Sequence, residues 1–514
     1  MKKTLIVLAG LFVLSIATII CAGTVIDANV DEVQFEENAI FGDASEVEGV
    51  IVHRNLKWED MMYWHTTYVV GNPQATKTDY EFYAYEKADE YEWFEEGLRF
   101  TNAAELFSLN PDIEPEDGVG KALYELFKRT PNGENSCQTF RLKDYEDYYS
   151  FGITFDTKLY YFWIEPENED DFANDEVVKK QREVLEHFNE FFRIPVVENE
   201  ICKIGVNKSE NGELFGYYIY DSYYYGDYFD ETSSEEYEEL ENAEHFTFEI
   251  NSVNTEDTFY FTFYPFTSEG NPVDTSLIPG GYGIYSFKYG DQFIDGESLK
   301  LEYALEPSGY VDVELDEQQE NLLIFREKEN DLGEIESYLT VLDLETMEEK
   351  QTIAYGKGDD NNLSRGYWVY DDFLIAQHDY FEAAVLSRAE DGTYHFEFTI
   401  PGTSEASGDN FLFFEDTCFD WNGEKLLVAG ENNNAPEGYF QEQYLFYNPL
   451  TGEQSIAYGR YRMSCGFYLS VFDKNGMSYY GEYDCNLDTD LYSQKACTIT
   501  RYNRLRVTWP EDTP

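Results

Sequence analysis

The sequence predicts an all-β fold with minor helical insertions, and more specifically a seven-bladed β-propeller with about four antiparallel strands in each blade. Two observations lead to this prediction. From about residue 246 onward, short runs rich in Tyr, Phe, Val, Ile and Leu alternate with Asn, Gly and Asp turns, which is typical of strands and hairpins. Hairpins of one design also recur at intervals close to the length of a propeller blade, which favours a series of similar sheets.

The N-terminal segment, residues 1–23, has the layout of an export signal. Lys2 and Lys3 precede an apolar run over residues 5–20, which is followed by Cys21 and Ala22. This order of basic, apolar and small residues is typical of a secretory signal, and a run of about 17 to 20 apolar residues can also span a bilayer. A cleaved signal, a retained anchor and a lipoprotein stay open. Each of them places the rest of the chain outside the cell or on its surface.

Residues 24–245 form the less regular part of the sequence, and we expect them to supply the first, irregular blades. Strands are predicted at residues 50–56, 63–70, 79–85 and 150–154, and on both sides of the Asn-Gly turn within residues 201–220. Helices are predicted at residues 120–128 and 175–192, because apolar residues recur there at three- and four-residue steps. Six blades, eight blades and a separate N-terminal β-rich domain stay open.

Residues 246–510 contain the repeat that predicts the blades. The hairpins at residues 338–356 and 444–459 each consist of a strand, a polar turn and a second strand ending in Ala-Tyr-Gly, and residues 384–402 share the design. Their ends lie roughly fifty residues apart, the length of a four-stranded unit. One more unit fits before them, ending near Glu306, and one fits after them. We therefore expect five propeller-like units, with the two Ala-Tyr-Gly strands at equivalent positions two blades apart.

The charge of the chain excludes several classes of partner. The sequence holds 35 Lys and Arg against 103 Asp and Glu, which gives a net charge of −68. Nucleic acids and anionic membrane surfaces are bound by clustered basic side chains, and this composition opposes both. Disordered acidic chains are poor in aromatic residues, whereas this chain has 7 Trp, 44 Tyr and 39 Phe. We expect a folded, aromatic-rich body inside an acidic surface.

Six cysteines lie outside the N-terminal signal, namely Cys137, Cys202, Cys418, Cys465, Cys485 and Cys497. An even number in an exported chain permits disulfides, and no pair has the two-residue spacing of a zinc knuckle or a redox motif. We expect a bond between two of Cys465, Cys485 and Cys497. Several buried thiols are the alternative.

Four segments resemble a group of uncharacterised secreted proteins of Firmicute bacteria with a propeller-like β-repeat body. These segments are residues 41–49 (FGDASEVEG), 63–68 (YWHTTY), 191–196 (FFRIPV) and 274–285 (DTSLIPGGYGIY). The resemblance extends over most of the chain. It implies an exported bacterial protein with a propeller-like body, and it transfers no catalytic residue.

The sequence contains no recognisable catalytic motif, so we predict no catalytic residues. The six histidines lack the spacing of a zinc protease, and neither a Gly-x-Ser-x-Gly elbow nor a glycine-rich phosphate loop is present. Carboxylate pairs that hydrolyse glycosides are defined by their distance in space, so the sequence leaves them open.

Two segments are candidate sites. Tyr223, Tyr224, Tyr225 and Asp227 lie in an aromatic run that begins at Tyr217 and leads into an acid-rich, base-free stretch. Exposed tyrosine rings stack on sugar rings, and neighbouring carboxylates accept hydrogen bonds from the sugar hydroxyls. The same residues can instead form a contact with another protein. A core strand followed by a solvated loop is the alternative.

The second candidate is the short oxygen-rich segment that begins with Asp359 and Asp360, and it suits Ca²⁺. It lacks the full acidic and glycine spacing of an EF-hand loop, so a plain turn between blades is the alternative. No other cofactor is expected. The sequence thus predicts an exported, acidic β-propeller that binds a protein or a glycan at the bacterial cell surface. The alternative is an extracellular propeller enzyme that acts on polysaccharide through a carboxylate pair.

Overall fold

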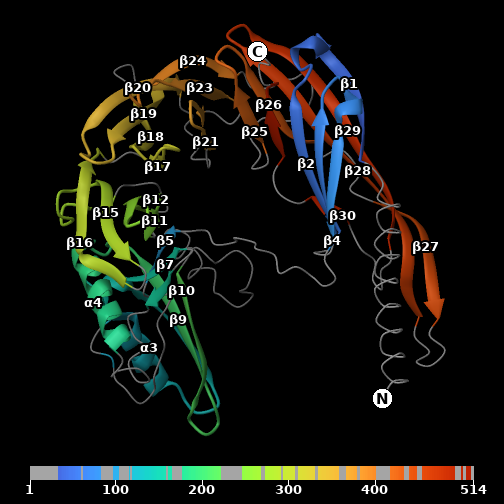
Figure 1. The fold of residues 1–514 in the computed structure, drawn as a ribbon. Coiled ribbons are helices and arrows are strands. Elements are labelled where there is room, and N and C mark those ends of the chain that lie inside the picture. The colour runs from blue at the N-terminus through green and yellow to red at the C-terminus, as the bar shows by residue number, and fades with distance from the viewer. Residues whose placement is uncertain are drawn as a thin grey trace, which may run out of the picture.

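The fold is all-β, with many antiparallel sheets and two described α-helices, and the sheets follow one another along an arc (Figure 1). The structure is a computed structural model. It describes residues 33–58, 62–82, 97–102, 115, 118–157, 160–164, 176–221, 246–267, 273–290, 293–306, 311–329, 334–357, 366–378, 382–400, 417–432, 439–447, 454–491, 499–501 and 505–510.

Three sheets in the C-terminal half are four-stranded, antiparallel and consecutive in the chain. The first contains β12 (Ser252–Asn254), β13 (Thr258–Thr262), β15 (Gly283–Gly290) and β16 (Phe293–Ala304). The second contains β17 (Val311–Leu315), β18 (Asn321–Glu329), β19 (Ile335–Asp343) and β20 (Glu349–Lys357). The third contains β21 (Tyr367–Val369), β22 (Phe373–Gln377), β23 (Ala383–Arg388) and β24 (Tyr394–Ile400). Their last strands end close to the unit boundaries that the repeat spacing predicts.

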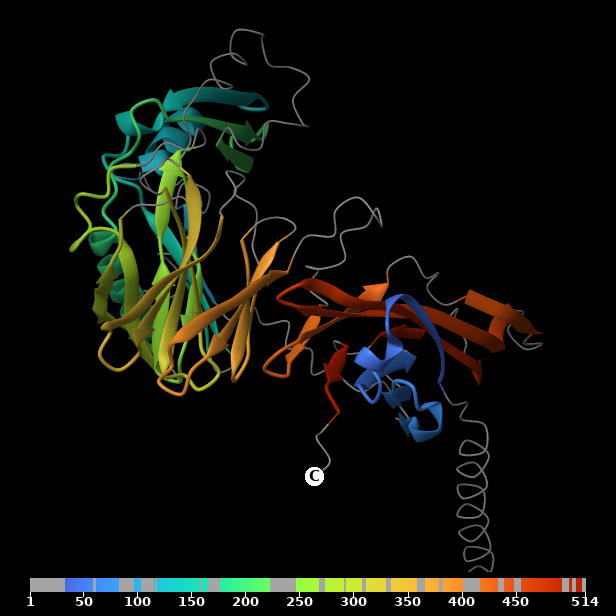
Figure 2. The same cartoon turned by 90° about the horizontal axis from the view of Figure 1, so that it is seen from above.

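The fourth sheet joins both ends of the chain. It contains β25 (Cys418–Trp421), β26 (Leu426–Asn432), β28 (Gln454–Asp473), β29 (Gly476–Leu491) and the N-terminal β1 (Gln34–Gly42), while β27 (Tyr439–Tyr447) pairs with the first half of β28. Seen from above, the blue N-terminal strands lie against the red C-terminal strands (Figure 2).

The expected equivalence of the two Ala-Tyr-Gly strands is wrong. Residues 354–356 lie in β20, the last strand of the β17–β20 sheet, whereas residues 457–459 lie in the first part of β28, which pairs with β27 off the main order of the fourth sheet. The two hairpins are locally alike, since each carries a β-bulge within its Ala-Tyr-Gly. The difference comes from strand length: the 20 residues of β28 pair first with β27 and then with β26.

A fifth sheet contains strands from both ends of the chain. It consists of β2 (Ile51–Trp58), β3 (Met62–Val69), β4 (Lys77–Phe82), β30 (Ile499–Arg501) and β31 (Arg506–Thr508), and both C-terminal strands pair with β2. None of the sheets formed by the described residues closes on itself.

The remaining strands form two three-stranded sheets and one two-stranded sheet, and both helices lie in the same part of the chain. These strands are β5 (Gly97–Asn102), β7 (Phe151–Thr157) and β8 (Tyr160–Ile164) in one sheet, β6 (Asn135–Arg141), β9 (Ile201–Lys208) and β10 (Leu214–Asp221) in another, and the pair β11 (Phe246–Glu249) and β14 (Tyr264–Thr267). The helices are α3 (Gly118–Arg129) and α4 (Glu176–Phe191), with short 3-10 turns η1 (Ala44–Glu46), η2 (Pro73–Ala75) and η3 (Leu142–Asp144). Both helices lie where the apolar periodicity predicts them.

Neighbouring sheets pack face to face around separate apolar clusters. One cluster joins the β12–β16 sheet to the β17–β20 sheet, the next joins β17–β20 to β21–β24, and further clusters join β21–β24 to the fourth sheet and that sheet to β2 and β3. The β17–β20 sheet, the β21–β24 sheet and the fourth sheet are therefore covered on both faces, which a single twisted four-stranded sheet cannot achieve alone.

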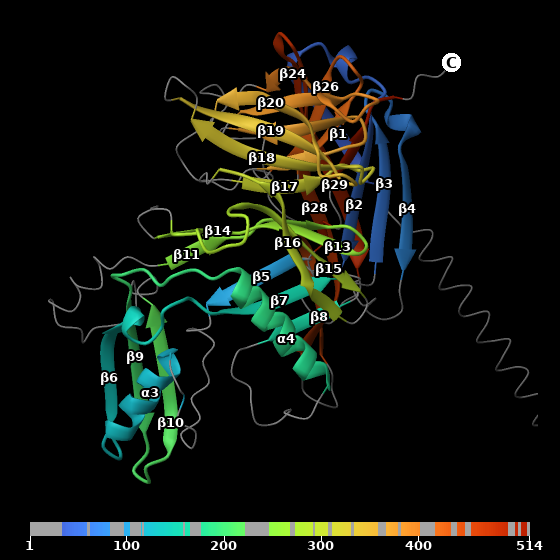
Figure 3. The ribbon, with the colours of Figure 1, turned by 90° about the vertical axis from the view of Figure 1, so that its left-hand side faces the viewer.

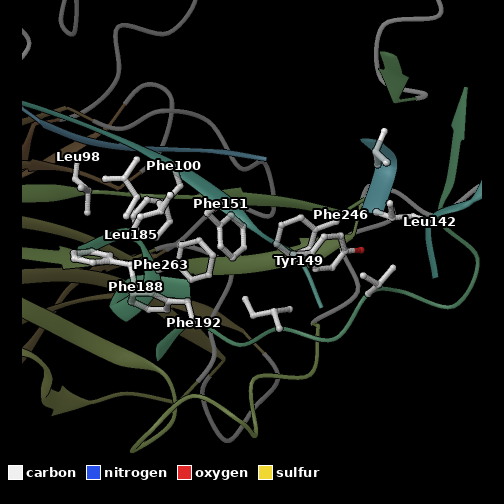
Figure 4. Packing of buried hydrophobic residues seen from close by; sticks show 14 of the residues in the cluster. Leu98, Phe100, Leu142, Tyr149, Phe151, Leu185, Phe188, Phe192, Phe246 and Phe263 are labelled. Atoms are coloured by element: carbon white, nitrogen blue, oxygen red, sulfur yellow. The ribbon is translucent and has the colours of Figure 1, made fainter. Parts of the chain in front are cut away.

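The largest cluster is aromatic and lies between the β5–β7–β8 sheet, α4 and the β12–β16 sheet. Phe188 of α4 and the adjacent Phe192 point toward Phe100, Phe151 and Phe263 (Figure 4). The ring centroids of Phe192 and Phe263 are 4.9 Å apart and those of Phe100 and Phe263 are 5.2 Å apart, the spacing of tilted aromatic pairs. The helical periodicity of the sequence thus supplies one wall of this core.

Candidate functional site

The sheet of β6, β9 and β10 projects with α3 from one end of the arc (Figure 3). β9 is the central strand, and most of its residues are buried. Among the strands that the structure describes, β10 has β9 as its single neighbour, so β10 is the edge strand of this sheet. The hairpin between the two strands turns at Asn211 and Gly212, and Gly212 has a φ of +86°, a conformation that glycine adopts without strain.

A β-bulge in β10 turns a phenylalanine into solvent. Leu214 pairs with Lys208 and Gly216 pairs with Asn207, which leaves Phe215 as the extra residue. Its side chain is 84% exposed, the highest value among the large apolar side chains in the described part of the chain. Bulges of this kind re-aim a side chain and are common beside functional sites.

Tyr217 is the second exposed aromatic residue on this strand, with 37% of its surface accessible. We call Phe215 and Tyr217 together the aromatic edge. Burying a large aromatic side chain is worth about 1.5–3 kcal/mol, so two of them left on one edge strand mark a surface suited to contact with another molecule.

The strand next to the aromatic edge, β9, is joined to the C-terminus of α3 by a lysine that caps the helix. Lys208, at the end of β9, donates hydrogen bonds to the carbonyl oxygens of Phe127 and Thr130 at the C-terminus of α3, both at 3.2 Å. The Lys208 ammonium also lies 4.5 Å from the centre of the Phe127 ring. A cation at this end of a helix is favoured by the helix dipole and by the unpaired carbonyls. The hairpin is therefore anchored at the strand next to β10.

The sequence-predicted site residues continue from this strand. β10 ends at Asp221, two positions before Tyr223, whereas Tyr223, Tyr224, Tyr225 and Asp227 themselves lie outside the described residues. Sequence reasoning missed Phe215. The signal that it did not use is an aromatic residue three positions after the glycine of an Asn-Gly turn and directly before another glycine, where a bulge forms readily.

A second candidate site is a pair of carboxylates on β17, the first strand of its sheet. Val311 and Val313 are buried against the preceding sheet, so the alternate residues Asp312 and Glu314 share the opposite face of the strand. Positions two apart on a strand are separated by about 7 Å. Burial raises the pKa of Glu314 to about 7, and the nearby negative charge of Asp312 contributes to the increase. Sequence reasoning did not single out this pair.

The metal site predicted at Asp359 and Asp360 also lies outside the described residues. Within the described part of the chain, no group of three or more His, Cys, Asp or Glu side chains is arranged to hold a metal ion. Neither of the described helices is long and apolar enough to cross a membrane.

No protein-family model matches the sequence, and no curated protein matches it.

Proposed function

We propose that this chain is an exported, acidic β-propeller that binds a protein or a glycan at the bacterial cell surface through the aromatic edge and the tyrosine-rich segment after it. The observation that carries the proposal is Phe215, which a bulge presents to solvent on an edge strand. An apolar side chain held in this way is typical of a contact surface. The absence of a catalytic motif from the sequence favours binding over catalysis.

The propeller part of the proposal rests on the stacking order of the sheets. Going along the chain, successive sheets are formed by β2–β4, by β5 with β7 and β8, by β12–β16, by β17–β20, by β21–β24 and by β25–β29. β1 pairs with the last of these sheets, and β31 pairs with the first. Joining the two ends of the chain in neighbouring sheets holds such an arrangement together. This series contains six sheets, one fewer than the seven blades that the sequence predicts.

The proposed export is supported by residues 1–23, in which basic residues are followed by an apolar run and then by small residues. The acidic composition fits an exposed location, because a high net charge keeps a protein soluble and repels anionic surfaces.

Sedimentation with isolated cell walls tests the proposed binding. The purified exported protein is mixed with walls from a Gram-positive bacterium, and its pelleted fraction is compared with that of a Phe215→Ser, Tyr217→Ser variant. We expect the variant to remain in the supernatant. Protease treatment of the walls abolishes pelleting when the ligand is a protein, and periodate oxidation abolishes it when the ligand is a glycan. Equal pelleting of both proteins contradicts the assignment of the site.

A second candidate function is glycoside hydrolysis, which the Asp312 and Glu314 pair favours. A glycosidase needs one carboxylic acid that stays protonated near neutral pH and one ionised carboxylate. With its pKa of about 7, Glu314 meets the first requirement. The test is the release of reducing ends from cell-wall and plant polysaccharides. Activity that Glu314→Gln and Asp312→Asn each abolish, and that the exposed Glu297→Gln leaves intact, supports this function, whereas activity that survives both contradicts it.

A further inference from the structure

A lysine, an asparagine and an aspartate meet at one end of the β17–β20 sheet. Lys350 of β20 lies across β19 from Asn321, the first residue of β18, and its ammonium donates a hydrogen bond to Asn321 Oδ1 at 2.7 Å. The Asn321 amide nitrogen donates to Asp316 Oδ2 at 2.5 Å. An ammonium only donates hydrogen bonds and an ionised carboxylate only accepts them. The amide therefore turns its carbonyl to the lysine and its nitrogen to the carboxylate.

The Asn321 amide is enclosed by its surroundings. Asn321 is 0% exposed and Asp316 is 1% exposed. A Cβ at Gly392, in the turn between β23 and β24, would lie 2.8 Å from Asn321 Nδ2, so the neighbouring sheet covers the amide. Asp316 is fixed by the backbone N–H of Glu320 and by the Arg388 guanidinium. This enclosure keeps water from the amide and favours attack by an amine that already touches it.

The lysine nitrogen lies near the distance at which an amine attacks a carbonyl group. A nitrogen 2.7 Å from Oδ1 is at most about 3.9 Å from the carbonyl carbon, because the C=O bond is about 1.23 Å long. Reacting atoms in near-attack arrangements are about 3–3.5 Å apart, so a small rotation at the flexible end of Lys350 closes the difference. Its side chain is 27% exposed and pairs with Asp343 at 2.9 Å, so solvent reaches the ammonium.

We propose that Lys350 and Asn321 form an isopeptide bond, and that Asp316 delivers a proton to the departing nitrogen. The Lys350 ammonium loses one proton to solvent, and the free amine attacks the carbonyl carbon of Asn321. As the C–N bond forms, the attacking nitrogen loses a second proton, which the Asp316 carboxylate passes to Asn321 Nδ2. The bond from the carbonyl carbon to Nδ2 breaks, and ammonia leaves and takes up a proton from solvent. One ammonium and one carboxamide thus give one secondary amide and one ammonium ion, without an oxidant.

The bond would join β18 to β20 across the end of β19. Like a disulfide, such a crosslink stabilises the fold by constraining the unfolded chain, and unlike a disulfide it withstands reducing agents. It lies beside the Arg388 and Asp316 contact between two neighbouring sheets, so it would strengthen the sheet at this contact. The proposal concerns the β17–β20 sheet alone and is independent of ligand binding at the aromatic edge.

Tryptic mapping of the folded, purified protein after reduction and denaturation tests the proposal. Trypsin cleaves after Lys and Arg, so an unlinked chain yields residues 301–326 and residues 329–350 as separate peptides. An acylated Lys350 is not cleaved. We expect a branched species of residues 301–326 joined to residues 329–357, lighter than the two peptides together by about 17 Da, the mass of ammonia. Complete recovery of unmodified residues 329–350, or Asn321 converted to aspartate in place of the crosslink, overturns the proposal.

Variants locate the bond. Lys350→Arg keeps the positive charge beside Asp343 but supplies no attacking amine, so the branched species is expected to disappear. Lys328→Arg is the matched control, because Lys328 forms an exposed ion pair with Glu306, and it should keep the branched species. A branched species that persists in Lys350→Arg contradicts the assignment.

The role of Asp316 is tested by the rate of crosslinking after refolding. Asp316→Asn keeps the size of the side chain but no longer passes the proton, and we expect the branched species to form at least about tenfold more slowly. Equal rates in this variant and the wild type would contradict the role of Asp316. If Asp316→Asn fails to fold, the wild type and Lys350→Arg decide the proposal by themselves.

Discussion

Asp316 and Arg388 form a buried ion pair between the β17–β20 and β21–β24 sheets. The Arg388 guanidinium lies 3.0 Å from Asp316 Oδ2, and the Asp316 side chain is fully buried. The carboxylate also accepts hydrogen bonds from the backbone N–H groups of Glu320 and Asn321 and from the Asn321 side chain. A buried charge is tolerated when it is paired and hydrogen-bonded in this way.

Removing one partner of this pair is expected to be costly. Arg388→Met leaves the Asp316 charge buried, and we expect it to lower the free energy of unfolding by about 3–5 kcal/mol, measured by urea denaturation. Lys143→Met, which removes a pair with Glu198 whose side chains are 41% and 76% exposed, is the control and is expected to cost less than about 1 kcal/mol. Similar effects of the two substitutions would show that the buried pair does not hold the sheets together.

Glu314 links stability to pH, because burial raises its pKa from 4.5 to about 7. A carboxyl group with a higher pKa in the folded state binds its proton more tightly there. The stabilisation is fully present below pH 4.5 and is lost as the pH rises through 7. Between pH 5 and pH 8, the wild-type protein should lose about 2–3 kcal/mol of unfolding free energy relative to Glu314→Gln.

Unfolding curves of both proteins at pH 5 and pH 8 measure this difference, and Glu297→Gln on the exposed part of β16 is the matched control. A constant difference between wild type and Glu314→Gln across this range would mean that the Glu314 carboxyl ionises in the folded protein as it does in the unfolded chain. The Val-Asp-Val-Glu alternation on β17 is visible in the sequence, but the burial that perturbs Glu314 depends on the packing of neighbouring sheets.

At the scale of elements, the C-terminal strand β31 pairs with β2 and so attaches the C-terminal part of the chain to the N-terminal sheet. Val507 pairs with Val52 of β2 and is 5% exposed in the cluster that also contains Tyr479 of β29. Just after β31, the backbone N–H of Trp509 donates to the carboxylate of Asp420 on β25 at 2.6 Å, which also ties the end of this strand to the fourth sheet.

Val507→Asp places an unpaired charge in this cluster and is expected to release β31. Amide hydrogen exchange across β2 should become at least about tenfold faster, which corresponds to about 1.4 kcal/mol of lost local stability. Arg506→Asp changes the exposed neighbour on the same strand and serves as the control. Unchanged exchange in β2 after Val507→Asp would show that β31 does not stabilise the sheet.

The sequence predicts elements well where one periodicity dominates. The stripe of Val184, Leu185, Phe188 and Phe192 predicts α4, and the alternation of short apolar runs with polar turns predicts the strands of the four-stranded sheets between residues 252 and 400. It fails at β28, because a strand that pairs with two different partners looks locally like two separate strands. The bulge that exposes Phe215 depends on register with β9, which one strand alone does not determine.

At the scale of the whole molecule, the net charge of −68 should oppose folding. At about 0.15 M salt the screening length is about 8 Å, so neighbouring carboxylates are only partly shielded. The unfolding midpoint should therefore rise between low salt and roughly 0.5 M NaCl. Ca²⁺ at equal ionic strength should raise it further if Asp359 and Asp360 bind the ion. Indifference to NaCl would contradict the repulsion, and the absence of an additional Ca²⁺ effect would remove support for the metal site.

We propose that the aromatic edge on β10 is the surface through which this protein binds its ligand. A titration of cell walls against the fluorescently labelled protein, at fixed ionic strength, measures its affinity directly. Replacing Phe215 and Tyr217 with serine is expected to weaken binding at least about tenfold, or about 1.4 kcal/mol. Phe396→Ser removes another exposed aromatic side chain, 44% accessible on β24, and should leave the affinity unchanged. Equal affinities for all three proteins, or a loss confined to Phe396→Ser, would contradict the account.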